Sequence, residues 1–412
     1  MNRQTRIENA LWGLFAGDAL SMPVHWYYNR DNITADYPGG IAGYAAPKHP
    51  HPESFMVGMR YMPDVAAAEA AGRPYDILHD AARFYQTSYS TLEIARDARE
   101  TEHGNAAPAT NERYHYHHGL GQAENTLGAH LVRVLMRSVI GAERYDPAAY
   151  LDAMIAFMTT PGINTDPYSE IYLRTWFEAY STGKDPRDCA AHQRDIWSIG
   201  SHGGMFRPMV VSMLAGDAYQ GLGFALEHQV LTHRSEIVAG SLGVVVPALH
   251  ALLDGADPMD QIRAMAARIR PARVRGEELF AAYRDAQGPG NIAKDQMWRY
   301  HTELADAPLD LDALLAQEPD AVIRKTIGTA CYPEHGLPLM LYLAALAGGE
   351  AEGALLWNAN AGGDNVNRAG VLGLLVGAAG MPEALKTGLA DYAELAGEIA
   401  AFAEIAAAGD AL

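Results

Sequence analysis

The stretch from 358 to 380 reads NANAGGDNVNRAGVLGLLVGAAG and joins a polar turn to a long apolar run. Apolar residues in 366–378 recur at helical spacing, which predicts a helix that begins directly after the turn. Paired glycines let a backbone approach a ligand closely, and the polar side chains beside them would place oxygen atoms around the helix start. Such glycines could equally hold a phosphate. The candidate ligand-binding residues of this turn, one of them a carboxylate that could act as acid or base, are Gly362, Gly363, Asp364, Asn365 and Asn367.

Helical spacing of apolar residues also dominates the rest of the chain, whereas alternating segments bounded by hairpin turns are scarce. The sequence therefore predicts an all-α fold, a compact bundle of many short helices. No repeat of fixed period favours a solenoid. The predicted helices cover 5–20, 76–100, 120–140, 147–158, 168–181, 207–215, 217–230, 234–253, 258–269, 275–286, 319–326, 335–347, 350–358, 366–378 and 382–406.

We expect one domain over 1–412, because no shift in composition marks a boundary. The region 29–119 is expected to be an irregular insertion, since prolines between 38 and 74 interrupt any long element there. Near its end the chain reads ERYHYHHGLG, where Tyr116 and His118 are candidate ligand-binding residues. Long loops are commonly functional, and this one could cover a ligand.

Composition excludes several classes of partner. A formal net charge of -19 over 412 residues repels nucleic-acid phosphates and anionic membranes, so we expect a small-molecule ligand and neither nucleic acid nor membrane. Two cysteines give no disulfide framework. Glu8 and Asp18 interrupt the first apolar segment, which therefore lacks the core of a signal peptide, and a cytoplasmic location is expected.

Two further stretches would place polar side chains at helix ends, where backbone groups lack partners. GLFAGDALSMPVHWYY, 13–28, offers Asp18 as a carboxylate and His25 as a proton donor or acceptor. Its glycines could instead serve a tight helix crossing, with the histidine as an ordinary structural group. The stretch HHGLGQAENTLG offers Glu124 and Asn125 just before a helix, where capping competes with a ligand role.

The segment SIGSHGGMFRPMV, 198–210, adds His202 and Arg207. The planar fork of Arg207 could hold a phosphate or carboxylate, or it could pair with an acidic side chain of the protein. Motifs of the forms HExxH, GxxxxGK[ST] and GxSxG are absent, as is a CxxC pair. Zinc proteases, P-loop enzymes, α/β-hydrolases and thiol-redox proteins are thereby disfavoured, which leaves carboxylate or metal-assisted chemistry.

Taken in order, these stretches resemble the ADP-ribosylglycohydrolase superfamily, which includes the J1-type crystallins, over nearly the whole chain. GLFAGDALSMP is similar to its opening Gly-x-x-x-Gly-Asp-Ala-x-Gly-x-Pro, and 159–189 is similar to its central aromatic segment. GSHGGMFRP, 200–208, is similar to its Gly-Asn-Gly-x-x-Met-Arg-x-x-Pro stretch. AGGDNVNRAGVLGLLVGAAG is similar to its closing Gly-Gly-Asp-Thr-Asp-Thr helix, the most specific of these signatures.

The resemblance implies an all-α orthogonal bundle whose cleft holds two divalent ions, usually magnesium, and hydrolysis at the anomeric carbon of ADP-ribose. The family positions for metal fall on Glu124, Asn125, Asp364 and Asn367. The family reads Thr-Asp-Asp-Thr where this chain has Ala-Glu-Asn-Thr, and Asp-Thr-Asp-Thr where it has Asp-Asn-Val-Asn. Hard cations require several charged oxygen ligands, so we expect no magnesium or weakly bound magnesium.

These patterns together predict a divergent ADP-ribosylglycohydrolase-like hydrolase, or a related enzyme, with reduced or absent metal dependence. It would cleave a glycosidic bond of an ADP-ribosyl, ribosyl or nucleoside-like small molecule. The alternative is a non-catalytic binding or crystallin-like structural protein that has lost the metal site. The candidate acid-base residues are Asp18, Glu124 and Asp364, with His25 and His202 as proton carriers and Arg207 as the anion anchor.

Overall fold

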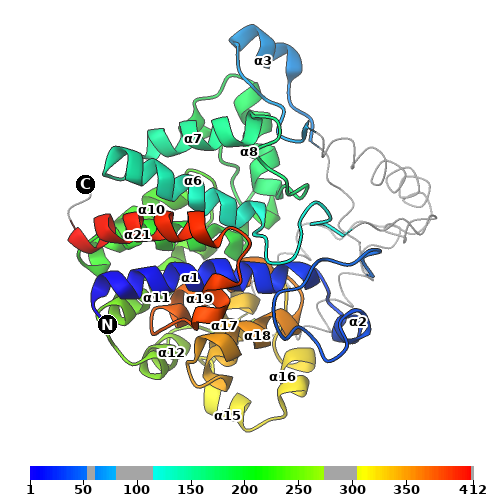
Figure 1. Ribbon diagram of the computed structural model, residues 1–412, viewed down its shortest axis with the longest axis vertical. Coiled ribbons are helices and arrows are strands. Elements are labelled where there is room, and N and C mark those ends of the chain that lie inside the picture. The colour runs from blue at the N-terminus through cyan, green and yellow to red at the C-terminus, as the bar shows by residue number, and fades with distance from the viewer. Residues whose placement is uncertain (53–60, 80–114, 273–303, 410–412) are drawn as a thin grey trace.

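The computed structural model describes residues 1–52, 61–79, 115–272 and 304–409. All regular elements in these ranges are helices, and the only β-type pairs among them are two isolated bridges. This confirms the all-α prediction. Figure 1 shows the helices gathered around α1 (Arg3–Ser21), which crosses the middle of the molecule.

The centre of the fold is the contact between α1 and α19 (Asn365–Gly377). The backbones touch because glycines face each other. A Cβ atom on Gly13 would lie 2.1 Å from the carbonyl oxygen of Gly373, a distance no side chain can occupy. The glycines of the opening motif therefore serve a tight helix crossing, as one of the two interpretations of that motif held.

Further helices pack on both sides of this pair (Figure 1), and one hydrophobic cluster runs through them. One side holds α6 (Leu127–Ala142), α7 (Pro147–Thr159) and α21 (Tyr392–Ala408). The other holds α11 (Glu236–Leu253), α12 (Pro258–Ala266), α17 (Pro333–Leu346) and α18 (Ala351–Ala361). By length and composition α11 could cross a membrane, but it packs against α9, α10 and α12, as a core helix does.

The remaining elements are short. They are α2 (Arg30–Asp36), α3 (Val65–Ala71), α8 (Ile171–Ser181), α9 (Phe206–Ser212), α10 (Ala218–Gln229), α15 (Leu311–Leu315), α16 (Pro319–Lys325) and α20 (Glu383–Thr387). Single 3₁₀ turns cover Met22–Val24, Pro186–Asp188, Trp197–Gly200 and His202–Gly204.

Most predicted helices are present, with three kinds of difference. The spacing does not predict α2, α3 or α15, because elements of five to seven residues are too short to show a period. The single helix predicted over 382–406 is two, α20 and α21, because the chain between them leaves the helical path and the Ala390 N–H donates to the Ala123 carbonyl. The helix predicted over 275–286 lies outside the described residues, as does most of that over 76–100, whose residues 76–78 are not helical.

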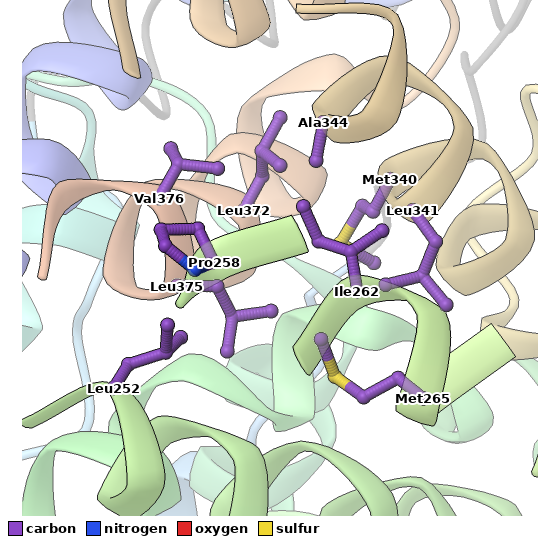
Figure 2. Close-up of a pocket in the computed structure, with 10 residues that line it drawn as sticks. All are labelled: Leu252, Pro258, Ile262, Met265, Met340, Leu341, Ala344, Leu372, Leu375 and Val376. Atoms are coloured by element: carbon purple, nitrogen blue, oxygen red, sulfur yellow. The ribbon is translucent and has the colours of Figure 1, made fainter. Parts of the chain in front are cut away.

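A small apolar cavity of about 10 Å³ lies between α11, α12, α17 and α19. Figure 2 shows that the side chains around it, which include Leu252, Ile262, Met340 and Leu375, are all hydrophobic. A polar ligand would find no hydrogen-bond partner there. This cavity is a packing gap in the core and is no candidate for the functional site.

Candidate active site

Asp364 stands immediately before α19 and is 1% exposed. Its carboxylate accepts a hydrogen bond from His25 Nε2 at 3.0 Å and contacts the amide nitrogen of Asn367 at 3.2 and 3.3 Å. His202 Nε2 lies 3.8 Å away. Burial acts to raise the pKa of Asp364, but the hydrogen bond from His25 and the nearby His202 outweigh it and lower the pKa. Asp364 is therefore a buried carboxylate that remains ionised.

Gly362 and Gly363 hold Asp364 in place through backbone contacts. Both have positive φ, 68° and 67°. The Gly363 N–H donates to the Tyr27 carbonyl at 2.8 Å, and the Trp26 N–H donates to the Gly363 carbonyl at 2.9 Å. A Cβ on Gly362 would lie 2.1 Å from the Tyr27 carbonyl oxygen. These two glycines thus pack against the protein backbone, and their ligand-binding role stays a prediction.

His25 continues into a line of buried groups. Its Nδ1 lies 2.7 Å from His117 Nε2, and His117 Nδ1 lies 2.9 Å from Asp166 Oδ1. Asp166 in turn accepts from the backbone N–H of Leu127 at 2.8 Å and of Tyr168 at 3.0 Å. The segments that meet here come from four separate parts of the chain.

The Asp364–His25–His117–Asp166 line contains three hydrogen bonds and therefore holds three protons, one in each bond. Two neutral imidazole rings supply only two of these three protons. Whichever atoms bear the third proton, the four groups together carry one negative charge instead of two. Burial lowers the pKa of His25 to about 4, although Asp364 opposes the shift. A neutral His25 that donates to Asp364 through Nε2 accepts from His117 through Nδ1.

Glu170, at the residue before α8, is a second carboxyl in the same place. Burial and the charge of Asp364 raise the pKa of Glu170 to about 8. A hydrogen bond links Glu170 to Asn367, which also contacts Asp364. Two carboxyls joined by one amide therefore have pKa values shifted in opposite directions, and such a division marks an acid and a base.

Most of these groups, though not Asp364, line a cavity of about 10 Å³, which has room for about one water molecule. Its polar lining comes from His25, Thr126, His117, Asp166, Tyr168, Glu170, Tyr172 and Asn367. The predicted residues His25, Asp364 and Asn367 therefore meet at one place. His117, Asp166 and Glu170 are additional functional candidates. The sequence signal for the last two was the aromatic segment 159–189, in which both occur.

Asp18 and Glu124 do not join this group. The Asp18 carboxylate accepts from the Thr126 backbone N–H at 2.8 Å, the Thr126 hydroxyl at 2.7 Å and the Asn125 amide at 2.8 Å. Burial raises the pKa of Asp18 against these bonds. Glu124 accepts from the Gly121 N–H at 2.6 Å. Asp18 thus fixes the start of α6, and Glu124 closes its own turn, and the acid-base role of both stays a prediction.

The remaining predicted residues lie around the site. His202 is fully buried behind Asp364, between the carbonyls of Cys331 and Asp364, and burial lowers its pKa to about 4. Tyr116 is buried with its ring 5.6 Å from that of Tyr168. Burial lowers the pKa of the neighbouring His118 to about 4. The loop 115–118 therefore reaches the site, although its central contribution is His117.

Two predicted residues do not line the cavity. Asn365 donates to the carbonyl of Ala359 at 3.2 Å, and its backbone carbonyl accepts from Asn358 at 2.8 Å, so it joins α18 to α19. Arg207 is 1% exposed and is not among the residues that line the cavity.

The family positions for metal do not fit a divalent ion. Asn125 uses its amide nitrogen on Asp18 and on the Phe15 carbonyl at 2.8 Å. Around Asp364 the neighbours present N–H donors where a cation would need further oxygens. Val366 offers no ligand atom at all. Among the described residues, no group of three or more His, Cys, Asp or Glu side chains could hold a metal ion.

Comparisons with known proteins agree with this architecture. The family model described as ADP-ribosylglycohydrolase matches residues 1–411. A solved structure, described as an ADP-ribosylglycohydrolase-related protein complex, superposes with a TM-score of 0.52 at 14% sequence identity, over 98% of this chain and 99% of that chain. That likeness establishes a shared fold. No curated protein sequence matches the chain.

Proposed function

The chain belongs to the ADP-ribosylglycohydrolase family, and on that premise we propose that it hydrolyses a glycosidic bond of an ADP-ribosyl, ribosyl or nucleoside-like small molecule. The observation that carries the proposal is the pair Glu170 and Asp364, two carboxyls that share Asn367 and whose pKa values are shifted in opposite directions. Glycoside hydrolysis needs one carboxyl as acid and another group as base.

Glu170 is the general acid in this mechanism. With a pKa of about 8 it is protonated at neutral pH and can give its proton to the leaving group as the bond to the anomeric carbon breaks. The leaving group then departs in its protonated form. Because its usual value is 4.5, an ordinary exposed glutamate would be ionised at neutral pH and could not do this.

Asp364, held in place by His25, is the basic side. The cavity beside His25 and Asn367 has room for about one water. Both ring nitrogens of His25 are engaged in hydrogen bonds, so the proton of that water passes to the ionised Asp364 carboxylate. The ionised Asp364 also places negative charge beside a developing oxocarbenium ion, which favours the transition state.

We propose that this reaction has reduced or absent dependence on magnesium. The support is chemical: the donors around Asp364 are N–H groups, and the family positions for the remaining ligands are engaged in hydrogen bonds with the protein. The line of two histidines supplies a water-orienting function from the chain's own residues.

The test is turnover of ADP-ribosyl-arginine, ADP-ribosyl-serine and ADP-ribose derivatives by the purified protein, with magnesium and with EDTA. We expect release of the leaving group under both conditions and its loss in Glu170→Gln. The matched control is Glu227→Gln, an exposed glutamate on α10. Absence of turnover for every substrate would refute the hydrolase, and activity only with magnesium would refute the metal-free mechanism.

A second candidate is a non-catalytic binding or crystallin-like structural protein. It is favoured by one observation, the size of the cavity, which holds about one water and no sugar ring. Thermal-shift measurement separates the candidates. Stabilisation by ADP-ribose without turnover would indicate a binding protein, and no response to ADP-ribose, nucleotides or divalent ions would indicate a structural one.

A further inference from the structure

Arg207 on α9 is a buried cation with no described carboxylate within hydrogen-bond distance. Its side chain is 1% exposed, and its guanidinium nitrogens make no hydrogen bond of normal distance and angle to a described residue, although the Tyr172 hydroxyl interacts with the guanidinium. The guanidinium instead lies over the rings of Tyr172, at 4.9 Å, and Phe206, at 5.2 Å. Arginine does not lose its proton in proteins, so this charge persists. A buried charge without a partner is costly, and native structures rarely contain one.

Four more polar atoms around Arg207 make no hydrogen bond of normal distance and angle to a described residue. They are the hydroxyls of Tyr150 and Tyr172 and the Nε2 atoms of His228 and His233. Each of these residues is at most 2% exposed and interacts electrostatically with Arg207. Their rings pack in pairs, Tyr150 with His228 at 4.7 Å and Tyr172 with His233 at 4.3 Å. These five residues are called the Arg207 cluster below.

The remaining polar atoms of the Arg207 cluster can all present hydrogen-bond donors. His228 Nδ1 lies 2.9 Å from the Tyr145 hydroxyl, and His233 Nδ1 lies 2.8 Å from the Thr232 hydroxyl. Burial, with the charge of Arg207, lowers the pKa of both histidines well below the usual range, so both rings are neutral. In the tautomer whose Nδ1 accepts from the hydroxyl, each neutral ring carries its hydrogen on Nε2, and the guanidinium, both tyrosine hydroxyls and both Nε2 atoms can donate.

No described carboxylate supplies the missing negative charge. Among carboxyls, Glu170 interacts electrostatically with Arg207, but burial raises the pKa of Glu170 to about 8. At neutral pH it is mostly protonated and leaves Arg207 uncompensated. The chain as a whole carries a net charge of -19, yet Arg207, at 1% exposure, lies among groups that can donate hydrogen bonds.

We propose that the Arg207 cluster binds one monatomic anion, chloride under ordinary conditions. A halide accepts N–H and O–H donors from several directions, needs no acceptor in return, and carries the single charge that balances Arg207. A water molecule would satisfy some of the donors but would leave the charge unbalanced. The inference does not rest on the proposed hydrolysis, because it concerns stability and binding alone.

The site also bears on the cavity, since Tyr172 belongs to both. An anion beside Arg207 removes a positive field that would otherwise favour ionised Glu170. Halide binding therefore helps to keep Glu170 in the acid form.

The first test uses the unaltered protein. Thermal unfolding is followed over a series of sodium chloride or sodium bromide concentrations, with ionic strength held constant by sodium gluconate. We expect the melting temperature to rise with the halide concentration, because the folded state alone binds the ion. Crystals grown with bromide should show an anomalous peak beside the Arg207 guanidinium. An electron-density feature without anomalous signal, together with melting temperatures independent of the halide, would identify a water and overturn the proposal.

A pair of variants tests the assignment to these residues. Tyr150→Phe removes one O–H donor at nearly constant volume and should raise the bromide concentration needed for half-maximal stabilisation about tenfold. Tyr342→Phe on α17 is the control, because its hydroxyl is equally buried and without a partner among the described residues. Equal halide dependence in both variants would contradict the proposed location.

Discussion

Replacement of Glu170 by glutamine should stabilise the protein at neutral pH while abolishing its activity. A glutamate whose pKa is raised from 4.5 to about 8 on folding prefers the protonated form in the native state. Below pH 4.5 both the folded and unfolded states are protonated, and the residue costs nothing through ionisation. As the pH rises toward 8, the unfolded chain releases the proton and the native state keeps it, so stability falls.

The size of this effect follows from the interval between the two values. Each pH unit above the unfolded pKa costs about 1.4 kcal/mol, so at pH 7 the expected loss is about 3 kcal/mol. This is an upper limit, because Glu170 is only partly shielded from solvent. Glutamine is neutral at every pH and has nearly the same shape. Glu170→Gln should therefore exceed the original protein in stability by up to about 3 kcal/mol at pH 7 and by less than about 1 kcal/mol at pH 5.

Urea unfolding at several pH values between 5 and 8 measures this difference directly. Glu227→Gln, an exposed position, serves as the control and should show no growing difference with pH. The reasoning fails if the stability gap between Glu170→Gln and the original protein is constant over this range or reverses. Turnover measured on the same samples should be lost in Glu170→Gln alone, which places the residue among those where activity is gained at the expense of stability.

Three other outcomes are expected. His117→Gln should reduce turnover by about a hundredfold or more with an unchanged far-UV circular dichroism spectrum, because the line from His25 to Asp166, which positions Asp364, is interrupted. A near-normal rate would count against the proposed role of this line. Gly13→Ala should destabilise the protein by about 3 kcal/mol in urea unfolding, because its Cβ would meet the Gly373 carbonyl oxygen at 2.1 Å. The control Gly223→Ala, with open space around it, should raise the free energy of unfolding by about 0.5 to 1 kcal/mol. Prolonged dialysis against EDTA should change neither turnover nor melting temperature; a fall in either that magnesium restores would reverse this view of the site.

The helices were predictable because their apolar residues recur with a local period, and α19 begins within a residue of its predicted start. The break between α20 and α21 could not be predicted, because it depends on a hydrogen bond from the Ala390 N–H to the Ala123 carbonyl, far away in the chain. Short-range patterns contain no information about such a partner.

The same limit governs the site. Asp18 and Asp364 look alike in sequence, each a lone carboxylate beside glycines at a helix end. One is held by three donors from the start of α6, and the other faces His25. Glu170 precedes a helix, where a glutamate is ordinary. Only the fold shows that Asp364 and Asn367 lie beside it and that burial changes its ionisation.

The close contact between α1 and α19 has a consequence for biosynthesis. Its two halves lie more than 340 residues apart, so a ribosome must deliver nearly the entire chain before the central helix pair can form. Until then α1, most of whose length is apolar and destined for the interior, has no native partner at its glycine face. Truncation before α19 should therefore yield an aggregation-prone fragment, and holding chaperones should accompany the emerging N-terminus through most of translation.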